Sequence, residues 1–323
     1  MCTAISNYSS SHYFGRNLDY EHDFGEKIMI TPRYYPFKFK MQPNMDTHFS
    51  MIGMAVESDD YPLYFDATNE YGLSMAGLNF PGNAHYFSPQ KQANGIAPYE
   101  LIPWILGKCK TVSQSKPLLE QLTLIDLPFN ERLPLSPLHW ILADQTESIV
   151  IESTISGMRI YNNPIGVLTN NPPFDYHIQN LSNYINVTAQ EAENRFAPNH
   201  AITAYSRGMG GIGLPGDNSS ASRFIRAAFT KLNSNTPAHN IAAVTQFFHI
   251  LNSVYQVDGC TKVGALYEKT LYSSCCDTKR GIYYYTTYEN PQISAVDIHC
   301  RDLNAKTLYS FPLNRMPQIL NSP

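Results

Sequence analysis

The sequence lacks the features that mark membrane, secreted and nucleic-acid-binding proteins. Its 23 Lys and Arg residues are balanced by 27 Asp and Glu residues, and the formal charge of −4 gives no basic surface for nucleic acid. No stretch reaches the ~18 consecutive apolar residues that a membrane-spanning helix needs. The N-terminus has no basic segment followed by an apolar run, as a secretion signal would. We therefore predict a cytoplasmic protein with no membrane span and no nucleic-acid partner.

The motifs of common metal and cofactor sites are missing as well. There is no CxxC, CxxH or HExxH spacing, and His139 and His249 lie in apolar runs that are typical of core histidines. There is also no P-loop and no GxSxG nucleophile elbow. We therefore expect neither a metal ion nor a cofactor.

One glycine-rich loop could be mistaken for a cofactor site. Gly208, Gly210 and Gly213 satisfy the GxGxxG pattern of dinucleotide-binding proteins. However, no clear strand leads into the loop, and Pro215 interrupts it before the next expected helix. The pattern favours a flexible loop at the rim of a pocket, where glycines let the backbone approach a ligand.

The six cysteines are not spaced as disulfide or redox pairs. In a chain of this size without a secretion signal, cysteines are usually reduced. Cys275 and Cys276 are neighbours in a strand-like run, where consecutive side chains point to opposite faces of a sheet. We interpret both as packing residues.

Apolar periodicity divides the chain into alternating groups of strands and helices. Strand patterns fill residues 2–80, residues 139–170 and the tail from residue 263, and helical spacing appears in residues 98–109, 116–125, 174–185, from about 219, and 238–256. Pro117 falls near the start of its expected helix, and Ser219 or Asp217 is a plausible N-cap of another. Two sheets packed face to face and covered by helices satisfy this order, so we predict an α+β fold. No repeat or linker divides residues 1–323, which we treat as a single domain.

The second residue of the chain is the first sign of chemistry. Cys2 follows the initiator methionine directly, and aminopeptidases remove Met1 when the next residue is as small as Cys. We therefore expect a mature chain in which the Cys2 thiol and a free α-amine share one residue, so that the chain terminus serves as the base of the nucleophile. A thiol titrates near ~8.5 and an α-amine near ~8, so both groups need little tuning at neutral pH.

The first eighteen residues read as two short strands joined by a polar turn. If the turn lies midway, Cys2 lies opposite roughly Asn17, and Arg16 and Asp19 flank the nucleophile from the partner strand. An arginine beside a thiol favours the thiolate. A carboxylate beside the α-amine can orient it. Lone charges near a hairpin end are usually surface residues, but here both fall where a thiol–amine pair could use them.

Two asparagines and two arginines are further candidates. Asn79 and Asn170 end strands before tight turns, where side chains face a cleft and could donate to an oxyanion, a contact worth about 3 kcal/mol of barrier. Asn before Pro or Gly is also common turn chemistry. Arg223 and Arg226 share one helix face, which for arginines is usually the face toward solvent.

Several long segments, in the same order, resemble one family. They are MCTAI, FGRNLDYE, GLNFPGNAHY, LPLSPLHWILAD, VLTNNPPFDYH, SRGMGGIGLPGDNSSASRFIRAAF and YSSCCD. They resemble the choloylglycine hydrolases, the N-terminal nucleophile hydrolases that include bile salt hydrolases and penicillin V acylases. The resemblance runs nearly end to end and is strongest to the bile salt hydrolases of gut lactobacilli and enterococci. It implies a four-layered αββα sandwich in which Cys2 starts a central strand.

The resemblance also implies roles for individual residues. Asn170 matches the asparagine of the family's TN-x-P motif, which donates to the oxyanion, and Asn79 matches the position that completes the oxyanion hole. Arg223 matches the catalytic arginine of the SRF motif, whereas Arg226 is expected to be structural. The implied catalytic residues are Cys2, Arg16, Asp19, Asn79, Asn170 and Arg223.

The resemblance favours conjugated bile salts as substrates, and it implies a homotetramer. Asn79 supports this choice because penicillin V acylases typically carry Tyr at that position; a penicillin V acylase with the same machinery is the alternative. The triplet Ser206-Arg207-Gly208 resembles the version of glycine-preferring relatives, which favours glycine over taurine conjugates. A non-catalytic binder that kept the fold is a third interpretation, which retention of Met1 would favour.

Overall fold

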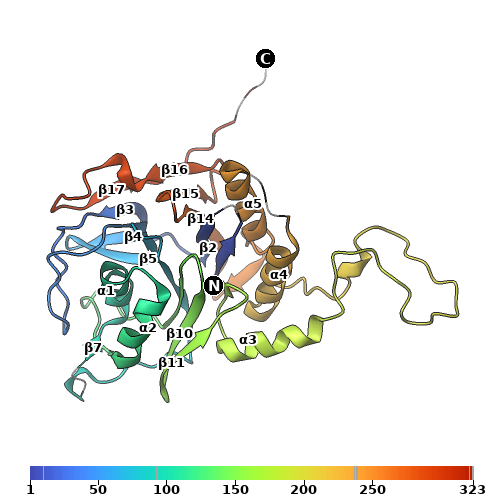
Figure 1. Ribbon diagram of the computed structural model, residues 1–323, viewed down its shortest axis with the longest axis horizontal. Coiled ribbons are helices and arrows are strands. Elements are labelled where there is room, and N and C mark those ends of the chain that lie inside the picture. Colours follow the sequence, from blue (N-terminus) through green and yellow to red (C-terminus); the bar gives the residue numbers. More distant parts are fainter. Residues whose placement is uncertain (10, 92–93, 236, 238, 320, 322–323) are drawn as a thin grey trace.

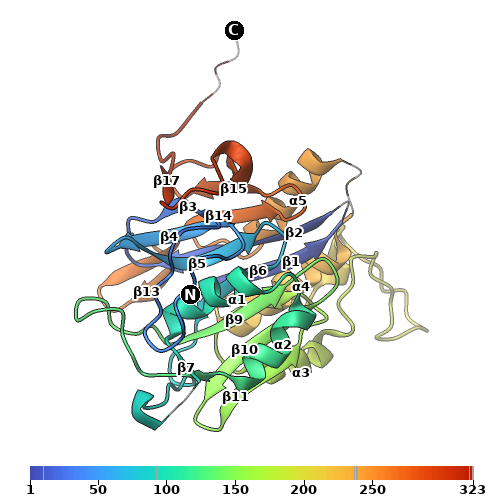
Figure 2. The same cartoon turned by 60° about the vertical axis from the view of Figure 1, so that its left-hand side comes forward.

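The computed structural model describes residues 1–9, 11–91, 94–235, 237, 239–319 and 321. Two stacked antiparallel sheets form the centre of the molecule (Figure 1, Figure 2). Within these residues, the first sheet has seven strands: β12 (Val167–Leu168), β1 (Cys2–Tyr8), β2 (His12–Tyr20), β14 (Leu266–Asp277), β15 (Ile282–Thr287) and β16 (Ser294–Asp297) in spatial order, with β13 (Thr261–Val263) on β14. The second has eight: β11 (Gly157–Asn162), β10 (Ser148–Thr154), β9 (Leu138–Ala143), β6 (Ser74–Asn79), β5 (Tyr61–Asn69), β4 (Met51–Ser58), β3 (Lys27–Thr31) and β17 (Tyr309–Pro312).

The eight-stranded sheet is apolar on both faces because it lies in the middle of the molecule. In β3, Ile28 and Ile30 belong to the core that the sheet shares with the seven-stranded sheet, whereas Met29 belongs to the core beneath helix α1 (Leu101–Lys108). In β9, Ile141 faces the first core and Trp140 the second. Successive side chains of a strand point to opposite faces, so both must be apolar here.

Helices cover the outer face of each sheet. On the eight-stranded sheet lie α1 and α2 (Val112–Gln121), and on the seven-stranded sheet lie α4 (Ser220–Asn233) and α5 (Asn240–Asn252), with α3 (Phe174–Asn180) beside α4 (Figure 1). Short elements complete the chain: β7 (Gly95–Ile96) parallel to β8 (Thr123–Leu124), and the 3-10 helices η1 (Pro89–Lys91), η2 (Pro98–Glu100), η3 (Leu181–Tyr184), η4 (Met209–Gly211) and η5 (Ile298–Cys300). The predicted α+β fold, a four-layered αββα sandwich, is confirmed.

One helix differs from its prediction at both ends. Helix α2 begins at Val112 rather than Lys116, because the Thr111 side chain caps it by accepting a hydrogen bond from the backbone N–H three residues on. Pro117 therefore lies inside the helix instead of near its start. The last residues of the predicted helix form strand β8. For α4, the cap is Ser219, one of the two predicted candidates.

The interpretations of the buried cysteines and histidines are mostly correct. Cys275 and Cys276 are free and buried in β14, as expected of packing residues. His139 is fully buried and shares a hydrogen bond with the Glu152 carboxylate at 3.1 Å. The core assignment of His249 is wrong, because the helical period of α5 turns this position outward while its apolar neighbours face the core.

One segment leaves the body of the molecule. The arm, which we define as residues 185–216 between η3 and α4, extends far to one side (Figure 1), and its two sides meet where the Thr188 N–H donates to the Gly210 carbonyl at 2.9 Å. It carries several exposed apolar side chains: Ile185, Phe196, Ile202, Tyr205 and Ile212. No helix among the described residues is long and apolar enough to cross a membrane.

Candidate active site

The candidate nucleophile is the first residue of strand β1. Cys2 pairs with Leu18 of β2, and the hairpin closes with Tyr8 opposite His12. The prediction that Cys2 lies opposite Asn17 is therefore wrong by one residue, since this closing pair shifts the whole register. Strands β2 and β14 approach closely at Gly15, where a Cβ atom would collide with the carbonyl oxygen of Ser274.

The backbone nitrogen of Cys2 is the atom predicted to act as the base for the Cys2 thiol, and a hydrogen bond fixes its position. It donates a hydrogen bond to Asn170 Oδ1 at 2.8 Å, and both residues are only 4% exposed. Met1 is still attached in this structure, so the nitrogen is an amide. The same atom becomes the α-amine when Met1 is removed, and Asn170 would then hold the predicted base beside the thiol.

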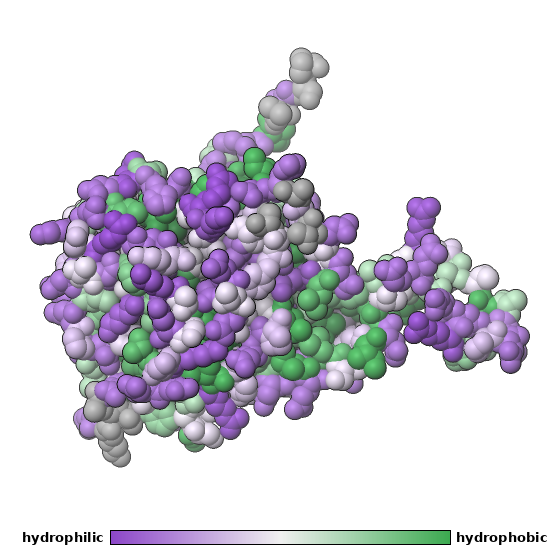
Figure 3. All heavy atoms as spheres, viewed as in Figure 1, coloured by the Kyte–Doolittle hydropathy of each residue, from purple (hydrophilic) through white to green (hydrophobic). Residues whose placement is uncertain are grey.

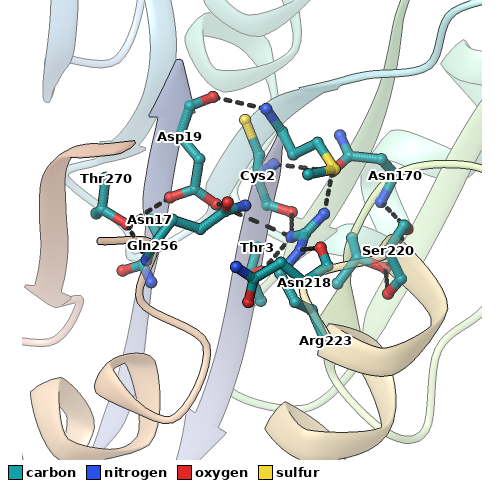
Figure 4. A network of polar contacts seen from close by, with 12 residues as sticks. Cys2, Thr3, Asn17, Asp19, Asn170, Asn218, Ser220, Arg223, Gln256 and Thr270 are labelled. Atoms are coloured by element: carbon teal, nitrogen blue, oxygen red, sulfur yellow. Dashed lines mark hydrogen bonds and ion pairs between the residues drawn. The ribbon is translucent and has the colours of Figure 1, made fainter. Parts of the chain in front are cut away.

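Arg223 lies at the centre of the polar cluster (Figure 4). It is fully buried, and its guanidinium donates to Asn170 Oδ1 at 2.7 Å, to Thr3 Oγ1 at 2.7 Å and to the carbonyl oxygen of Cys2. Burial lowers the pKa of Arg223, and the charges of Asp19 and Cys2 act in the opposite direction. The expectation of a solvated helix arginine is thus wrong for this residue, which faces the nucleophile as the resemblance implied.

Arg226 lies on the same helix but makes a different set of contacts. Its guanidinium donates to the backbone carbonyls of Ser253, Pro215 and Asp217. These bonds tie α4 to the end of α5 and to the loop before it. Arg226 therefore contacts no predicted site residue, in agreement with the structural role expected for it.

Asp19 is the carboxylate of the cluster. It has no exposed surface, and its Oδ2 lies 4.0 Å from Nη1 of Arg223. Thr270 of β14 donates to Oδ1 at 2.6 Å, and Gln256 donates to Oδ2 at 3.4 Å. These bonds come from the next strand of the sheet and from the segment after α5, so the carboxylate has a fixed orientation.

Arg16 connects the site to the second sheet. Its side chain leaves β2 and donates to the carbonyl oxygens of Phe65 at 3.0 Å and Gly77 at 2.6 Å, on strands β5 and β6. Burial alone would lower the pKa of Arg16, but the charges of Cys2 and Asp66 outweigh it and raise this pKa. Its Nη2 has no hydrogen-bond partner among the described residues. Arg16 is thus a fully buried cation whose charge interacts with that of Cys2.

Asn170 and Asn79 meet where one strand from each sheet ends, Asn170 just after β12 and Asn79 at the end of β6. Asn170 Nδ2 donates to the backbone carbonyl of Asn79 at 2.6 Å, so this contact uses the backbone of Asn79 rather than its side chain. The position of Asn170 is fixed twice more: its N–H donates to Ser220 Oγ at 2.8 Å, and its carbonyl accepts from His177 Nε2 at 2.9 Å. Burial lowers the pKa of His177 to about 4, so this ring is neutral near pH 7.

The structure adds residues that the sequence did not indicate. Thr3, Ser220, Gln256 and Thr270 all hydrogen-bond to predicted site residues, and Glu268 forms an ion pair with the Met1 amine. All are common polar residues, and those from α4 onward lie more than 200 residues from the nucleophile. No local motif could have identified them.

The cluster as a whole suits attack by sulfur on a carbonyl group. The buried side chains of the predicted site supply one thiol, two guanidinium groups, one carboxylate and one amide. Figure 4 labels four of these residues, Cys2, Asp19, Asn170 and Arg223. Low exposure strengthens electrostatic interactions with any charge that develops there. Among the described residues, no group of three or more His, Cys, Asp or Glu side chains is arranged to hold a metal ion.

Comparison with known proteins gives one consistent result. Residues 2–311 match the family described as linear amide C–N hydrolases, choloylglycine hydrolase family. The bile salt hydrolase/transferase of Lactiplantibacillus plantarum is 50% identical over 319 residues, which cover 98% of each chain. A crystal structure of a mutant of the conjugated bile acid hydrolase from Clostridium perfringens superposes with a TM-score of 0.92 at 35% identity, over 100% of both chains.

A more distant structure shares the fold alone. Penicillin V acylase from Agrobacterium tumefaciens superposes with a TM-score of 0.77 at 18% identity, covering 97% of this chain and 92% of the other. At 18% identity this likeness shows a shared sandwich architecture and does not indicate a shared substrate.

Proposed function

The chain belongs to the choloylglycine hydrolase family of linear amide C–N hydrolases, and from this premise we propose that it hydrolyses the amide bond of conjugated bile salts. The products are the free bile acid and glycine or taurine. The observation that carries the proposal is the near-complete match to a named bile salt hydrolase/transferase, together with a buried Cys2 at the start of the chain. We treat residues 1–323 as one catalytic domain.

The first half of the reaction forms an acyl-enzyme. After Met1 has been removed, the α-amine of Cys2 takes the thiol proton, and the sulfur attacks the amide carbonyl carbon. Asn170, through Nδ2, and Asn79 donate hydrogen bonds to the oxyanion that forms. When the C–N bond breaks, the protonated α-amine gives its proton to the leaving nitrogen, and a thioester remains on Cys2.

The second half returns the free enzyme. The α-amine takes a proton from water, the hydroxide attacks the thioester carbon, the C–S bond breaks, and the departing thiolate takes the proton back from the amine. Arg16 stabilises negative charge on the sulfur in both halves. Arg223 and Asp19 position the reacting groups. Arg223 donates hydrogen bonds to Asn170 and to the Cys2 carbonyl, and Asp19 balances the charge of Arg223. No cofactor takes part.

Water is not the only acceptor that a thioester can use. A primary amine that attacks the same carbon would form a new amide, and the L. plantarum relative is named a bile salt hydrolase/transferase. We propose that acyl transfer to amines competes with hydrolysis in this protein.

Penicillin V acylase activity is the alternative function. The likeness to a penicillin V acylase is confined to the fold. The sequence resemblance implies that typical members of that group carry Tyr where this chain has Asn79. We expect at most a side activity on penicillin V.

The direct test measures amine release from glycocholate, taurocholate and penicillin V. We expect turnover of both bile salts and its complete loss in Cys2→Ala, since Cys2 supplies the thiol of the predicted site. Glycocholate should be cleaved faster if the Ser206-Arg207-Gly208 triplet favours glycine. Equal rates on both conjugates would refute that preference, and faster turnover of penicillin V would refute the assignment of the substrate.

We also propose that the protein acts as a cytoplasmic homotetramer. The arm supports this assembly, because it leaves the body and exposes Phe196 at 93% and Tyr205 at 85%. Hydrophobic surface also gathers where the arm joins the body (Figure 3). Exposed apolar segments of this kind mark protein–protein contacts, and a second copy of the chain is the partner that the proposal names.

A further inference from the structure

The chain's own first residue occupies a defined place beside the nucleophile. The Met1 amine donates to the carbonyl oxygen of Asp19 at 2.7 Å, and the Met1 carbonyl accepts from the Asp19 N–H at 2.9 Å. Met1, which precedes strand β1, thus adds one more hydrogen-bonded pair between this end of the chain and β2. The contacts of Met1, the residue that processing releases, therefore mark polar groups beside Cys2 that can receive an amino group.

A buried carboxylate receives the amino group of this residue. Glu268, on strand β14, forms an ion pair with the Met1 amine, and its side chain is only 2% exposed. A buried carboxylate is costly unless a cation pairs with it. The Met1 side chain is 31% exposed, so the residue reaches from this buried carboxylate to solvent. Glu268 has no part in the mechanism proposed above.

The Met1 amine belongs to the residue next to Cys2 in the chain, and its surroundings favour its neutral form. Burial lowers the pKa of the Met1 amine, and the charges of Cys2 and Asp19 oppose this shift without cancelling it. The amine also interacts electrostatically with Cys2, whose sulfur carries the acyl group in the proposed reaction. A neutral amine is also the form that can attack a thioester.

We propose that the Glu268 carboxylate and the Asp19 carbonyl form a subsite for the amino group of an amino acid. In the mature enzyme this subsite binds the amine that hydrolysis releases and the amine that accepts the acyl group in transfer. The class of ligand is a primary α-amino acid, because Met1 itself shows the fit. The transfer step rests on the proposed function, because it needs the acyl-enzyme. The binding of the amine at the subsite can be measured without turnover.

The subsite also gives transfer a complete route for its protons. The acceptor enters as an ammonium ion and gives one proton to Glu268. The neutral nitrogen attacks the thioester carbon, so that the C–N bond forms and the C–S bond breaks. The departing thiolate takes the second proton from nitrogen, which leaves an amide product and a free Cys2 thiol.

The first experiment measures how the acyl-enzyme divides between two acceptors. Glycocholate and L-methionine are incubated with protein whose intact mass shows that Met1 is absent, and cholate and cholyl-methionine are quantified by mass spectrometry. The ratio of the two products does not depend on the fraction of active enzyme. In Glu268→Gln we expect this ratio to fall about tenfold, because the charge-assisted contact to the amine is lost.

The matched control is Glu289→Gln, which removes a carboxylate that is 40% exposed and pairs with Lys269, the neighbour of Glu268 in β14. This change should leave the ratio within about twofold of the wild type. An unchanged ratio in Glu268→Gln, or an equal fall in both variants, would overturn the subsite.

A second experiment needs no turnover. Wild-type protein is alkylated at Cys2 with iodoacetamide in the presence of L-methionine or of 4-(methylthio)butanoate, which has the same skeleton without the amine. We expect methionine to slow alkylation and the desamino compound to have little effect, with the difference lost in Glu268→Gln. Equal protection by both compounds refutes the subsite. If bile salts are not hydrolysed at all, the proposed function fails, and this measurement still decides whether the amine is bound.

Discussion

The active-site cluster and the arm depart from ordinary burial in opposite directions. In the cluster, Arg16, Asp19 and Arg223 have no exposed surface, although charged residues are rarely fully buried. In the arm, Phe196 and Tyr205 are almost fully exposed, although aromatic residues usually contribute to a core. The first departure is stabilised within one chain by paired charges and hydrogen bonds. The second has no such compensation in the chain described here, which is why we propose a second copy as its partner.

The difference shows where each region obtains its stability. Every charge of the cluster has a partner from another element, so removal of one member leaves others buried and unpaired. The arm makes few contacts with the body, so a change there should leave the fold intact. Mutations in the two regions should therefore separate stability and catalysis from assembly.

Loss of Arg223 should have the largest effect on the fold. In Arg223→Met, the Asp19 carboxylate loses its countercharge, and Asn170, Thr3 and the Cys2 carbonyl lose a donor. We expect the free energy of unfolding to fall by about 3–5 kcal/mol, with loss of bile salt hydrolysis. Urea denaturation and amine release measure the two effects.

Arg226→Met is the control for this change, because Arg226 lies on the same helix and binds only backbone carbonyls. Its cost should stay within about 2 kcal/mol, with activity retained. If the two variants behave alike, Arg223 is no more than a helix anchor.

Loss of Asn170 should act mainly on the rate. Asn170→Ala removes the proposed oxyanion donor and the acceptor of the Cys2 nitrogen, so we expect kcat for glycocholate to fall about 10²–10³-fold. The neighbouring Asn171, whose Nδ2 donates to the Pro81 carbonyl, provides the matched variant Asn171→Ala. A change of kcat that is the same at both positions would assign the effect to the turn and not to the oxyanion.

The part of the site that sequence could predict is the part encoded locally. Cys2, Arg16 and Asp19 lie in one hairpin, so strand periodicity brought them together with an error of one residue in register. Asn170 and Arg223 were candidates from the sequence pattern, but only the resemblance to family motifs assigned them to the site, since periodicity alone favoured a turn residue and a solvated arginine. Glu268 and Thr270 were missed because their partners lie about 250 residues away, and an ordinary Glu or Thr in a strand carries no signal of such a contact.

A smaller effect should appear in the pH dependence of stability. The pKa of His177 is about 4 in the folded protein and 6.5 when unfolded, so the unfolded state binds more protons between these values. Stability should therefore be complete above pH 6.5 and decrease as the pH falls toward 4. His12, whose pKa is also about 4 through burial, adds to the same decrease.

In His177→Gln, we expect the loss of stability between pH 7 and pH 4 to be smaller by about 2–3 kcal/mol, as urea denaturation at each pH would measure. His249→Gln changes an exposed histidine of α5 and should leave the slope as it is in the wild type. A variant of His177 that loses stability as steeply as the wild type would mean that this ring is protonated without unfolding.

The smallest effect on chemistry should come from the arm, and this prediction separates the two regions most directly. Replacing Phe196 and Tyr205 together by Ser removes two large apolar side chains, each able to contribute about 2 kcal/mol to an interface. We expect light scattering to show a shift from tetramer to smaller species, while kcat per chain changes by less than about twofold. Ile241→Ser, on the exposed side of α5, controls for the loss of an apolar surface residue elsewhere. If assembly is unchanged, the exposed apolar residues of the arm serve another purpose. If kcat falls together with the fraction of tetramer, the arm of one chain contributes to the active site of another. Assembly and catalysis would then not be separable by mutations in the two regions.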